Sequence, residues 1–379
     1  MPLLARHPLR VQPYFGHRSR DRLVLSARAL RAKPPGFDQR SRLRAVKTMV
    51  TQFVSHEMAS IPVTLELEGD GGKILEHEGH TNDEGYVHFD VALDPHWDLP
   101  EHPAWELGRI RWVNIEGPQV EDVHILAPGR DSRLAVISDI DDTIIETGIT
   151  GGLRSVMRNW KRVFAQLPHE RVPVPGADAF YGQLAGGVLE RGEHRPASRI
   201  PATKRPFFYI SSSPWNLFSY LVAYQRLQGL PLGPLKLRDW GFNRRTLGKS
   251  SHGAHKDAAI DGILGMYPDL RFAMIGDDTQ GDLPAFARAV DMYPDRVAAV
   301  FLRTVSGHTF SPEEEAACSA IRDAGVPIWL GDSYDAGLDF LRTLGFTPGG
   351  ETEQIVKTVE KVEDAGSPAE EPGPASETA

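Results

Sequence analysis

The sequence predicts a protein of two parts: a small all-β sandwich domain followed by an α/β domain with a mostly parallel sheet. From Ser132 onward, short apolar runs alternate with helical patterns, which is typical of a parallel sheet covered by helices. Between residues 48 and 127, short runs alternate apolar and polar residues and are separated by turn residues, which is typical of half-buried strands. With 379 residues, the chain is long enough for both domains and for tails.

The chain divides into four predicted segments. Residues 1–47 form a basic N-terminal segment, 48–130 the β-sandwich, 131–348 the α/β domain, and 349–379 an acidic tail that should be disordered. Residues 1–50 hold twelve Lys and Arg against two acids, whereas residues 350–379 hold eight acids against two lysines. The basic start could meet nucleic acid or an anionic membrane surface, or it could pair with acidic surface of the same chain.

Several strands are expected in the first 130 residues. One apolar run lies within the basic segment, and four more lie within the predicted sandwich: Leu23–Leu30, Met49–Val54, Pro62–Leu67, Tyr86–Val91 and Ile110–Ile115. Turn residues separate them, and a Pro-Gly-Arg-Asp turn at residues 128–131 closes this part. It contains no cluster of His, Cys or acids, so we expect a docking or scaffolding role.

The α/β domain has six predicted strands and several predicted helices. The strands are Leu134–Ser138, Phe207–Ile210, Leu235–Leu237, Phe272–Ile275, Val297–Leu302 and Pro327–Leu330. The helices include Trp215–Leu227, Asp257–Met266, Pro284–Val290, Glu313–Ala324 and Tyr334–Leu344.

An acid cluster follows the first of these strands, where Asp139, Asp141 and Asp142 occupy three of four consecutive positions. Residues two apart in an extended chain point the same way, so Asp139 and Asp141 should face one cleft. Buried carboxylates are costly without a partner. Mg²⁺, which prefers carboxylate and phosphate oxygens, would turn their repulsion into binding.

Three interpretations of this cluster compete. A calcium-binding loop is excluded, because Ile144 and Thr150 occupy the positions where that loop requires glycine and a bidentate Glu. The second interpretation is an ordinary acidic turn after a strand. The third is a phosphoryl-transfer site in which Asp139 is the nucleophile and Asp141 the general acid and base.

Two further positions could contact a phosphate group. Ser211 follows the strand Phe207–Ile210 and comes just before a helix, where a hydroxyl and backbone N–H groups can hold phosphate oxygens. A serine there can equally be a helix cap. Lys256 begins a predicted helix and could neutralise a transferring phosphoryl group, or it could simply be a solvated lysine. His255 beside it could serve orientation, or it could be an ordinary core or surface histidine.

A second acid cluster, Asp277, Asp278 and Asp282, follows the strand Phe272–Ile275. Open α/β sheets bind ligands at the carboxyl ends of their strands. Asp277 and Asp282 therefore fit a metal site that Asp139 and a backbone carbonyl near Asp141 would complete, while Asp278 shares this role or fixes the loop. Two such clusters, with Ser211 and Lys256 between them, favour phosphoryl transfer over an acidic turn.

In order and chemistry, residues of about Leu134–Leu344 resemble the haloacid dehalogenase-like (HAD) phosphatases. The first motif corresponds to Asp139–Thr143, the second to Ser211, the third to Lys256 and the fourth to Asp277–Asp282. Residues 146–153 occupy the squiggle-and-flap position. This resemblance implies a HAD-like, Rossmannoid catalytic domain with helices on both faces of the sheet.

Within that superfamily, four strings are similar to one family, the phosphatidate phosphatase catalytic domain known from actin-patch-associated proteins. They are SDIDDTI, YISSSPWNLF, HKDAAIDGILGMYPDLRFAMIGDDTQGD and VFLR. The β-domain in front resembles bacterial-type members. Ser212 departs from the Asn expected in the second motif, but the preceding Ser211 is the expected phosphate contact.

The resemblance implies a Mg²⁺-dependent hydrolysis of a phosphate monoester. Asp139 would form an aspartyl-phosphate, and Asp141 would protonate the leaving group and then activate water. Lys256 would also be catalytic. The implied phosphate contacts are Thr143, Ser211 and Ser212, and Asp142 would help to fix the loop. The implied ligands of the Mg²⁺ cofactor are Asp139, Asp141, Asp277, Asp278 and Asp282.

The implied substrate is phosphatidate, converted to diacylglycerol, or a related lipid phosphate. Residues 235–249 combine basic with aromatic side chains: Lys236, Arg238, Arg244, Arg245, Lys249, Trp240 and Phe242. Such a mixture suits an anionic membrane interface, nucleic-acid ends, or simple packing. Two other functions remain open: a phosphatase acting on a soluble or polynucleotide monoester, and a non-catalytic binding protein that uses its β-domain.

The amino-acid composition limits the class of protein and the compartment in which we expect it. The chain is 41% hydrophobic and 25% charged, as in soluble globular proteins. The single cysteine, Cys318, excludes an intrachain disulfide and suits a reducing compartment. The sequence has no apolar run long enough to cross a membrane and no signal peptide. The net charge of −9 argues against a nucleic-acid coat. We therefore expect a cytoplasmic protein that meets its lipid substrate at a membrane surface.

Overall fold

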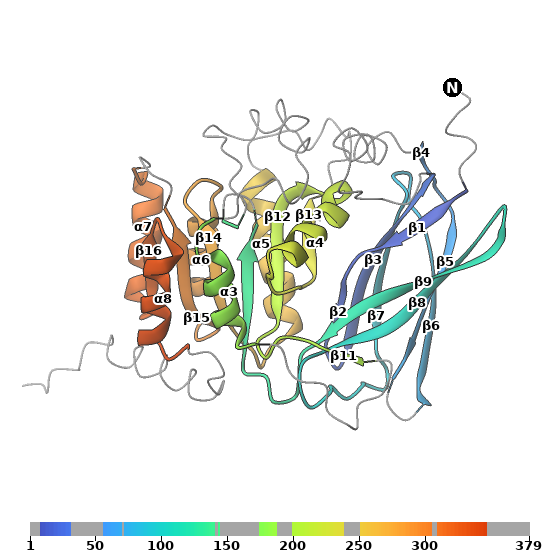
Figure 1. Ribbon diagram of the computed structural model, residues 1–379, viewed down its shortest axis with the longest axis horizontal. Helices are drawn as coiled ribbons and strands as arrows, with labels where there is room; N and C mark the ends of the chain where they lie inside the picture. The colour runs from blue at the N-terminus through green and yellow to red at the C-terminus, as the bar shows by residue number, and fades with distance from the viewer. Residues whose placement is uncertain are drawn as a thin grey trace, which may run out of the picture.

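The computed structural model describes residues 8–31, 56–69, 72–140, 143–144, 174–187, 199–238, 251–304 and 309–346. Several predicted features lie outside these ranges: the strand Met49–Val54, Asp141 and Asp142, the squiggle-and-flap segment, most of the basic and aromatic residues of 239–249, and the acidic tail. Figure 1 shows two bodies of secondary structure, a curled β-sheet and a parallel sheet with helices.

The parallel sheet has six strands in the order β13-β12-β10-β14-β15-β16, and all pairs are parallel. The strands are β10 (Leu134–Asp139), β12 (Phe207–Pro214), β13 (Leu235–Arg238), β14 (Arg271–Asp277), β15 (Val297–Arg303) and β16 (Ile328–Gly331). Each corresponds to a predicted strand. These strands are continuous apolar runs because both faces of the sheet are buried.

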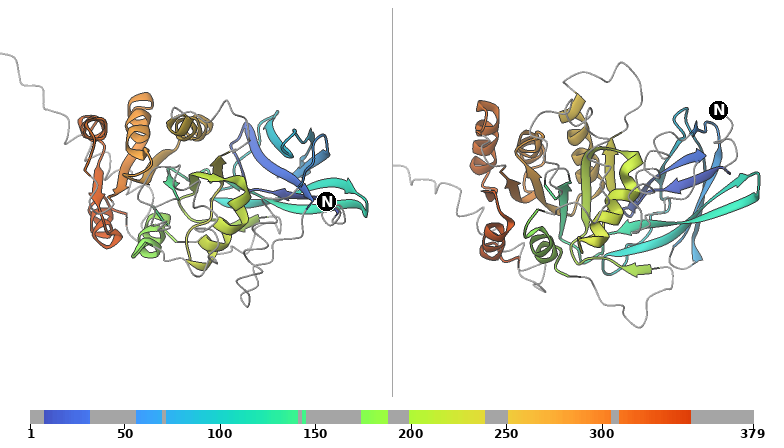
Figure 2. Two further views of the ribbon diagram at one scale, coloured as in Figure 1. Left: turned by 90° about the horizontal axis from the view of Figure 1, so that it is seen from above. Right: turned by 45° about the horizontal axis from the view of Figure 1, so that its top comes forward.

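Helices cover both faces of this sheet, as predicted (Figure 2). On one face lie α5 (Ser251–Met266), α6 (Asp282–Met292) and α7 (Pro312–Asp323); on the other lie α3 (Ala177–Ala185), α4 (Phe218–Leu227) and α8 (Tyr334–Thr343). The short 3-10 helix η4 (Trp215–Leu217) leads into α4. Successive residues of β10 alternate between the two hydrophobic clusters. The structure therefore confirms a mixed α/β architecture with a parallel sheet.

No helix among the described residues is both long and apolar enough to span a bilayer.

The second sheet contains ten strands that are mostly antiparallel. They are β1 (Arg10–Pro13), β2 (Gly16–Arg18), β3 (Arg22–Arg31), β4 (His56–Glu57), β5 (Pro62–Glu68), β6 (Ile74–His80), β7 (Tyr86–Ala92), β8 (Ala104–Asn114), β9 (Gly117–Ala127) and β11 (Arg199–Pro201). The sequence predicts two facing sheets, but hydrogen bonds link all ten strands into one sheet. The sheet curls around a hydrophobic cluster to which β3, β5, β7, β8 and β9 contribute.

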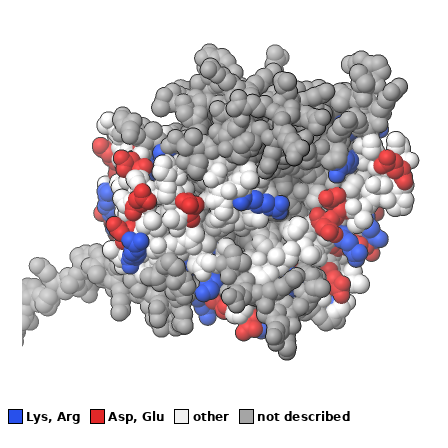
Figure 3. All heavy atoms as spheres, viewed as in Figure 1, with Lys and Arg blue, Asp and Glu red and all other residues white. Residues whose placement is uncertain are grey.

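Residues 10–31 belong to this sheet, although the sequence analysis sets them apart as a basic segment. Leu23, Leu25 and Ala27 are buried while the residues between them are only partly buried, so one face of β3 lies in the core. The basic side chains find acidic partners within the chain: Arg18 forms a buried pair with Glu106, and Arg22 pairs with Asp90 on β7. For these arginines, the intramolecular interpretation of the basic start holds. On the face shown in Figure 3, acidic and basic side chains of the described residues are interspersed.

The two sheets are joined by aromatic and polar contacts. Tyr14 stacks on Trp215, with ring centroids 4.4 Å apart, and meets Phe218 edge-on at 4.8 Å. Each such pair contributes about 0.5–1.5 kcal/mol beyond the area it buries. The side-chain amide of Gln12 donates to the hydroxyl of Ser219 at 2.6 Å. These contacts attach the first strands of the chain to the start of α4.

A second junction is made by β11, which leaves the α/β part and pairs antiparallel with β8. Its first residue, Arg199, donates to Glu106 at 2.9 Å, and Glu106 also accepts from Arg18 at 2.8 Å. A carboxylate shared by two arginines in a buried position is far better compensated than an isolated buried charge. The predicted division at residue 131 thus separates strands that the structure pairs.

A buried histidine at this junction makes stability depend on pH. His17 contacts the Tyr267 hydroxyl at 2.8 Å, and burial lowers the pKa of His17 well below its ordinary value of 6.5. Below pH 6.5, the unfolded chain therefore binds a proton at His17 that the folded chain does not bind. As pH falls below 6.5, we expect the free energy of unfolding to drop by up to ~1.4 kcal/mol per pH unit from this residue.

Urea unfolding of wild type and His17→Gln at pH 7.5 and pH 5.5 measures this effect. The loss of stability on acidification should be smaller in His17→Gln. A matched variant at an exposed position, His96→Gln, should keep the wild-type loss. Equal losses in all three proteins would contradict the assignment.

Candidate active site

The predicted site residues converge at the carboxyl ends of three neighbouring parallel strands. Strand β10 ends at Asp139 and β14 ends at Asp277, and these strands are adjacent, with Ser138 opposite Ile275. On the other side of β10, Asp139 lies opposite Ile210 of β12, and Ser211 is the next residue. This is the edge where open α/β sheets bind ligands.

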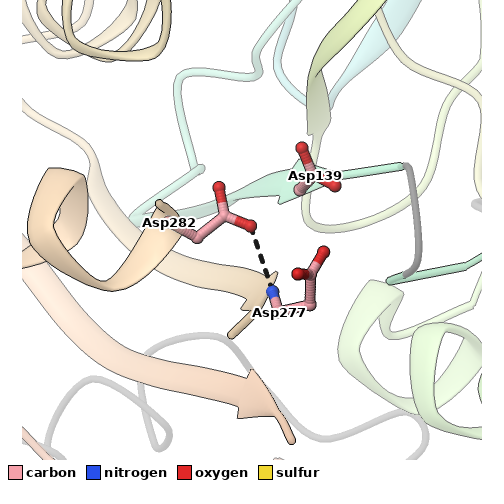
Figure 4. A group of neighbouring side chains, drawn as sticks. All are labelled: Asp139, Asp277 and Asp282. Carbon is pink, nitrogen blue, oxygen red and sulfur yellow. Dashed lines mark hydrogen bonds between the residues drawn. The ribbon is translucent and has the colours of Figure 1, made fainter. Parts of the chain in front are cut away.

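Three carboxylates form the centre of the site: Asp139, Asp277 and Asp282 (Figure 4). One oxygen from each lies within 4.8 Å of the others, and all three residues are at most 2% exposed. Asp282 is the first residue of α6, so two strands and a helix supply the three groups. Clustered, buried carboxylate oxygens are the kind of ligands that Mg²⁺ prefers, so the donor set fits this ion.

A glycine allows α6 to approach β14 closely. A Cβ atom at Gly276 would lie 2.7 Å from both Cβ and Cγ of Asp282, well inside the ~3.5–4.0 Å separation of non-bonded carbon atoms. With hydrogen at this position, the Asp277 amide donates to Asp282 Oδ2 at 3.0 Å. The glycine before Asp277 is thus explained by the close approach of α6 to the end of β14.

Lys256, on α5, is the positive charge that the structure pairs with these carboxylates. Its ammonium group lies 2.9 Å from Asp139 Oδ1 and also bonds Asp282, and the lysine is only 3% exposed. Burial alone lowers the pKa of Lys256, but Asp139, Asp282 and Asp277 outweigh it and raise that pKa. The three carboxylates therefore favour the charged, protonated form of Lys256.

Asp277 has the most perturbed environment of the three acids. Burial, followed by repulsion from Asp282, raises the pKa of Asp277 to about 7, while Lys256 and Thr279 oppose this rise. Thr279 donates both its backbone N–H, at 2.6 Å, and its hydroxyl to Asp277 Oδ1. The free protein therefore holds more negative charge here than one lysine balances, which favours a divalent cation.

Thr143 links two of the carboxylates. Its buried hydroxyl lies 3.1 Å from Asp277 Oδ2 and 3.3 Å from Asp139 Oδ2, and it donates to these oxygens. The sequence analysis assigns Thr143 to substrate phosphate. In the structure its hydroxyl contacts carboxylates and helps to orient Asp139 and Asp277, and the contact to substrate phosphate stays a prediction.

The serines of the second motif lie at the end of β12. Ser211, Ser212 and Ser213 are all buried, and Ser211 Oγ accepts from the Ser213 amide at 2.9 Å. Strand β12 continues through these serines to Pro214, and η4 and then α4 follow. Ser211 thus lies one residue beyond Ile210, the partner of Asp139, and its phosphate contact stays a prediction.

Other predicted residues take peripheral places or lie outside the described residues. Asp278 is buried, but its backbone N–H donates to Arg303 O at 3.1 Å, and it is not one of the three clustered acids. Asp277, rather than Asp278, is therefore the acid that faces Asp139 and Asp282. His255 is half-buried on α5. Asp141 lies outside the described residues.

Sequence reasoning missed Thr279, which holds Asp277 in place. An acid that accepts from the backbone two residues later is a common turn pattern, so Asp277 followed by Thr279 could have suggested this contact. Two buried tyrosines also contact the residues around Asp139: Tyr181 contacts the Ser138 hydroxyl, and Tyr334 donates to the Thr143 carbonyl. No local pattern marks them, because both come from helices far away in the chain.

Removing the Lys256 charge should destabilise the protein strongly. In Lys256→Met, buried carboxylates lose their ammonium partner, and breaking a buried pair in this way costs about 3–5 kcal/mol. We expect this loss in urea unfolding at pH 8 without divalent ions. The exposed control Lys73→Met should change stability by less than about 0.5 kcal/mol. Equal stabilities of the two variants would show that the carboxylates are not ionised around Lys256.

Comparison with known proteins shows a family to which the segment holding this site is similar. Residues 134–304 match the family described as "Phosphatidate phosphatase APP1, catalytic domain". Phosphatidate phosphatase APP1 of Saccharomyces cerevisiae is 31% identical over 173 residues, which cover 46% of this chain and 26% of that protein. An uncharacterized protein of Schizosaccharomyces pombe is 22% identical over 173 residues, 45% of this chain and 25% of that protein. The chain thus spans about a quarter of the length of these curated relatives.

Solved structures add nothing to this comparison. A calcium-binding mutant of Bacteroides uniformis beta-glucuronidase 2 is 10% identical, covering 82% of this chain and 34% of that chain, with a TM-score of 0.24. A Bifidobacterium dentium beta-glucuronidase is 8% identical, covering 86% of this chain and 60% of that chain, with a TM-score of 0.22.

The segment that matches the family, residues 134–304, contains the acids and the lysine of the site together with Ser211: Asp139, Lys256, Asp277 and Asp282. Residues 134–304 of this chain are therefore similar to the family of the phosphatidate phosphatase APP1 catalytic domain.

Proposed function

We propose that this protein is a Mg²⁺-dependent phosphatase that hydrolyses a phosphate monoester through an aspartyl-phosphate, and that its substrate is phosphatidate or a related lipid phosphate. One observation carries the proposal: Lys256 bridges Asp139 and Asp282 beside Asp277, at the carboxyl edge of a parallel sheet. A purely structural site has no need for three buried acids around one lysine, because buried charges destabilise a fold unless they are fully paired.

Asp139 is the proposed nucleophile. Lys256 keeps its carboxylate ionised, and contacts from Lys256 to Oδ1 and from Thr143 to Oδ2 hold the group in one orientation. A carboxylate oxygen would form a bond to phosphorus while the bond from phosphorus to the substrate alkoxide breaks. This covalent step divides one difficult displacement into two easier ones.

The proton transfers are assigned to Asp141 on the motif resemblance. Asp141 would give its proton to the leaving alkoxide and then take a proton from the water that attacks the phosphorus. That attack breaks the bond between Asp139 and phosphorus and releases inorganic phosphate. General acid and base catalysis of this kind contributes about 10²- to 10⁴-fold in rate. Ser211, adjacent to Asp139, is the proposed hydroxyl contact for the phosphoryl oxygens.

Asp139, Asp277 and Asp282 are the proposed carboxylate ligands of Mg²⁺, with a main-chain carbonyl at Asp141. When bound, Mg²⁺ would neutralise charge on the phosphoryl oxygens, which is a large part of catalysis in phosphoryl transfer. Lys256 shares this task from the α5 side. The same arrangement supports a HAD-like fold: acid clusters follow two adjacent central strands, β10 and β14, of an all-parallel sheet.

The lipid substrate is supported by the family resemblance and by the printed name of the yeast relative. The basic and aromatic run 235–249 gives less support than the sequence suggests. Lys236 interacts electrostatically with Arg22 and Asp90 of the curled sheet, and burial lowers the pKa of Lys236 to about 8. That lysine therefore faces the junction between the two sheets. Work at a membrane surface remains part of the proposal.

Phosphate release from phosphatidate in mixed micelles tests the proposal. Wild type should release phosphate with Mg²⁺ and stop in EDTA, and Asp139→Asn should fall to the buffer blank, because the amide is not a nucleophile toward phosphorus. The exposed control Asp269→Asn should match wild type.

Two other outcomes would redirect the assignment. Release from a soluble aryl phosphate but not from phosphatidate would keep Asp139 as nucleophile and overturn the lipid substrate. No release from either compound by folded wild type, or full activity of Asp139→Asn, would overturn the proposed reaction.

A further inference from the structure

Two buried tyrosines connect the chain on either side of Asp139. Tyr334, the first residue of α8, donates its hydroxyl to the main-chain carbonyl of Thr143 at 2.9 Å. Tyr181, on α3, has its hydroxyl 2.8 Å from Ser138 Oγ. The rings of these two tyrosines meet edge-on, with centroids 6.0 Å apart. Ser138 immediately precedes Asp139, and Thr143 lies four residues after it. We call this series Ser138–Tyr181–Tyr334–Thr143 the hydroxyl chain.

Both ends of the hydroxyl chain act on the proposed reacting groups. At one end, Ser138 Oγ donates to the carbonyl of Asp139 itself at 2.7 Å. At the other end, Tyr334 holds the carbonyl of Thr143, whose own hydroxyl contacts Asp139 Oδ2 and Asp277 Oδ2. Displacement of the Thr143 backbone would therefore displace the hydroxyl that lies between these two carboxylates.

The phenols have little freedom to move. Tyr181 and Tyr334 are 0% and 1% exposed. The Tyr334 ring packs against Phe180, with centroids 4.7 Å apart, and stacks on Trp329 at 6.2 Å. Because packed aromatic rings fix their hydroxyl groups, the hydroxyl chain can act as a rigid brace. A ring without the hydroxyl would pack equally well, so the hydroxyl contacts need a reason of their own.

We propose that Tyr334, together with Tyr181, is a positioning residue for the reaction: it holds Thr143, and through it the carboxylates of Asp139 and Asp277, in the arrangement that in-line attack requires. The inference rests on the proposed phosphatase function. Tyr334 lies beyond residue 304, where the match to the family ends, so the C-terminal helix α8 contributes to a site whose charged groups all precede it.

Tyrosine-to-phenylalanine variants separate positioning from packing, because they remove only the hydroxyl. With a soluble aryl phosphate and saturating Mg²⁺, Tyr334→Phe should lower kcat about tenfold, since small misplacements of reacting groups are costly. KM should stay within about twofold of wild type, because ground-state binding is unaffected. Tyr181→Phe should act in the same direction. The double variant should lose little more than Tyr334→Phe alone, because the two rings are in contact and the effects of residues in contact are not additive.

Tyr267→Phe is the matched control. It also removes a buried phenol hydroxyl, but that hydroxyl contacts His17 at the junction of the two sheets. Its melting temperature should fall about as much as that of Tyr334→Phe, because each variant loses a buried hydrogen bond. Its kcat should stay at the wild-type value. Wild-type kcat in Tyr334→Phe, or an equal loss of kcat in Tyr267→Phe, would overturn the positioning role.

Amide hydrogen exchange gives a test that does not depend on activity. The Ile144 amide donates to the Ile140 carbonyl at 3.0 Å, and a peptide containing it should exchange faster in Tyr334→Phe but not in Tyr267→Phe. Unchanged exchange in Tyr334→Phe would overturn the positioning role. If wild type released no phosphate but exchange were still faster in Tyr334→Phe alone, the brace would be supported. Only the proposed phosphatase function would then be overturned.

Discussion

The site depends on the contact of one buried ammonium group, that of Lys256, with the carboxylates of Asp139 and Asp282. All three side chains are at most 3% exposed. Removing such charges from water costs several kcal/mol per ion unless partners compensate, so the arrangement stands only as a unit. A third acid, Asp277, exceeds what one lysine can balance, and burial together with repulsion from Asp282 raises its pKa. The same excess of negative charge makes the site suitable for a divalent cation. The positive charge of that cation would in turn suit a negatively charged phosphoryl group.

The fold supports this cluster at each level. Parallel pairing brings the ends of β10 and β14 together, although Asp139 and Asp277 lie far apart in the sequence. Gly276 lets α6 place Asp282 against β14. The curled sheet packs against the α/β part at a distance from this cluster, where Tyr267, just after α5, contacts His17 and also the Arg18 carbonyl at 3.3 Å. Among the described residues, the carboxylate cluster contains no side chain of the curled sheet.

Local patterns were sufficient to predict the charged centre. All six strands of the parallel sheet are apolar runs in the sequence. Because open α/β sheets bind ligands at the carboxyl ends of their strands, the acids that follow two of these runs, Asp139, Asp277 and Asp282, are expected to meet, with Lys256 nearby. The sequence could not show that the first strands join the β-sheet, because the charge of Arg18 is balanced by Glu106, a partner far away in the sequence. Strands β6 and β9 were missed, since their exposed residues hide the alternation. The direction of the Thr143 hydroxyl and the Tyr334 contact also depend on tertiary packing alone.

The most direct test of the account is the covalent intermediate on Asp139. Wild type mixed with substrate and Mg²⁺, quenched in acid within milliseconds and digested, should yield the peptide containing Asp139 with the added mass of one phosphoryl group. Treatment with hydroxylamine, which cleaves acyl phosphates, should remove that mass. A phosphoryl group on another residue, or its absence during rapid turnover, would contradict the role of Asp139 and with it the purpose assigned to Lys256.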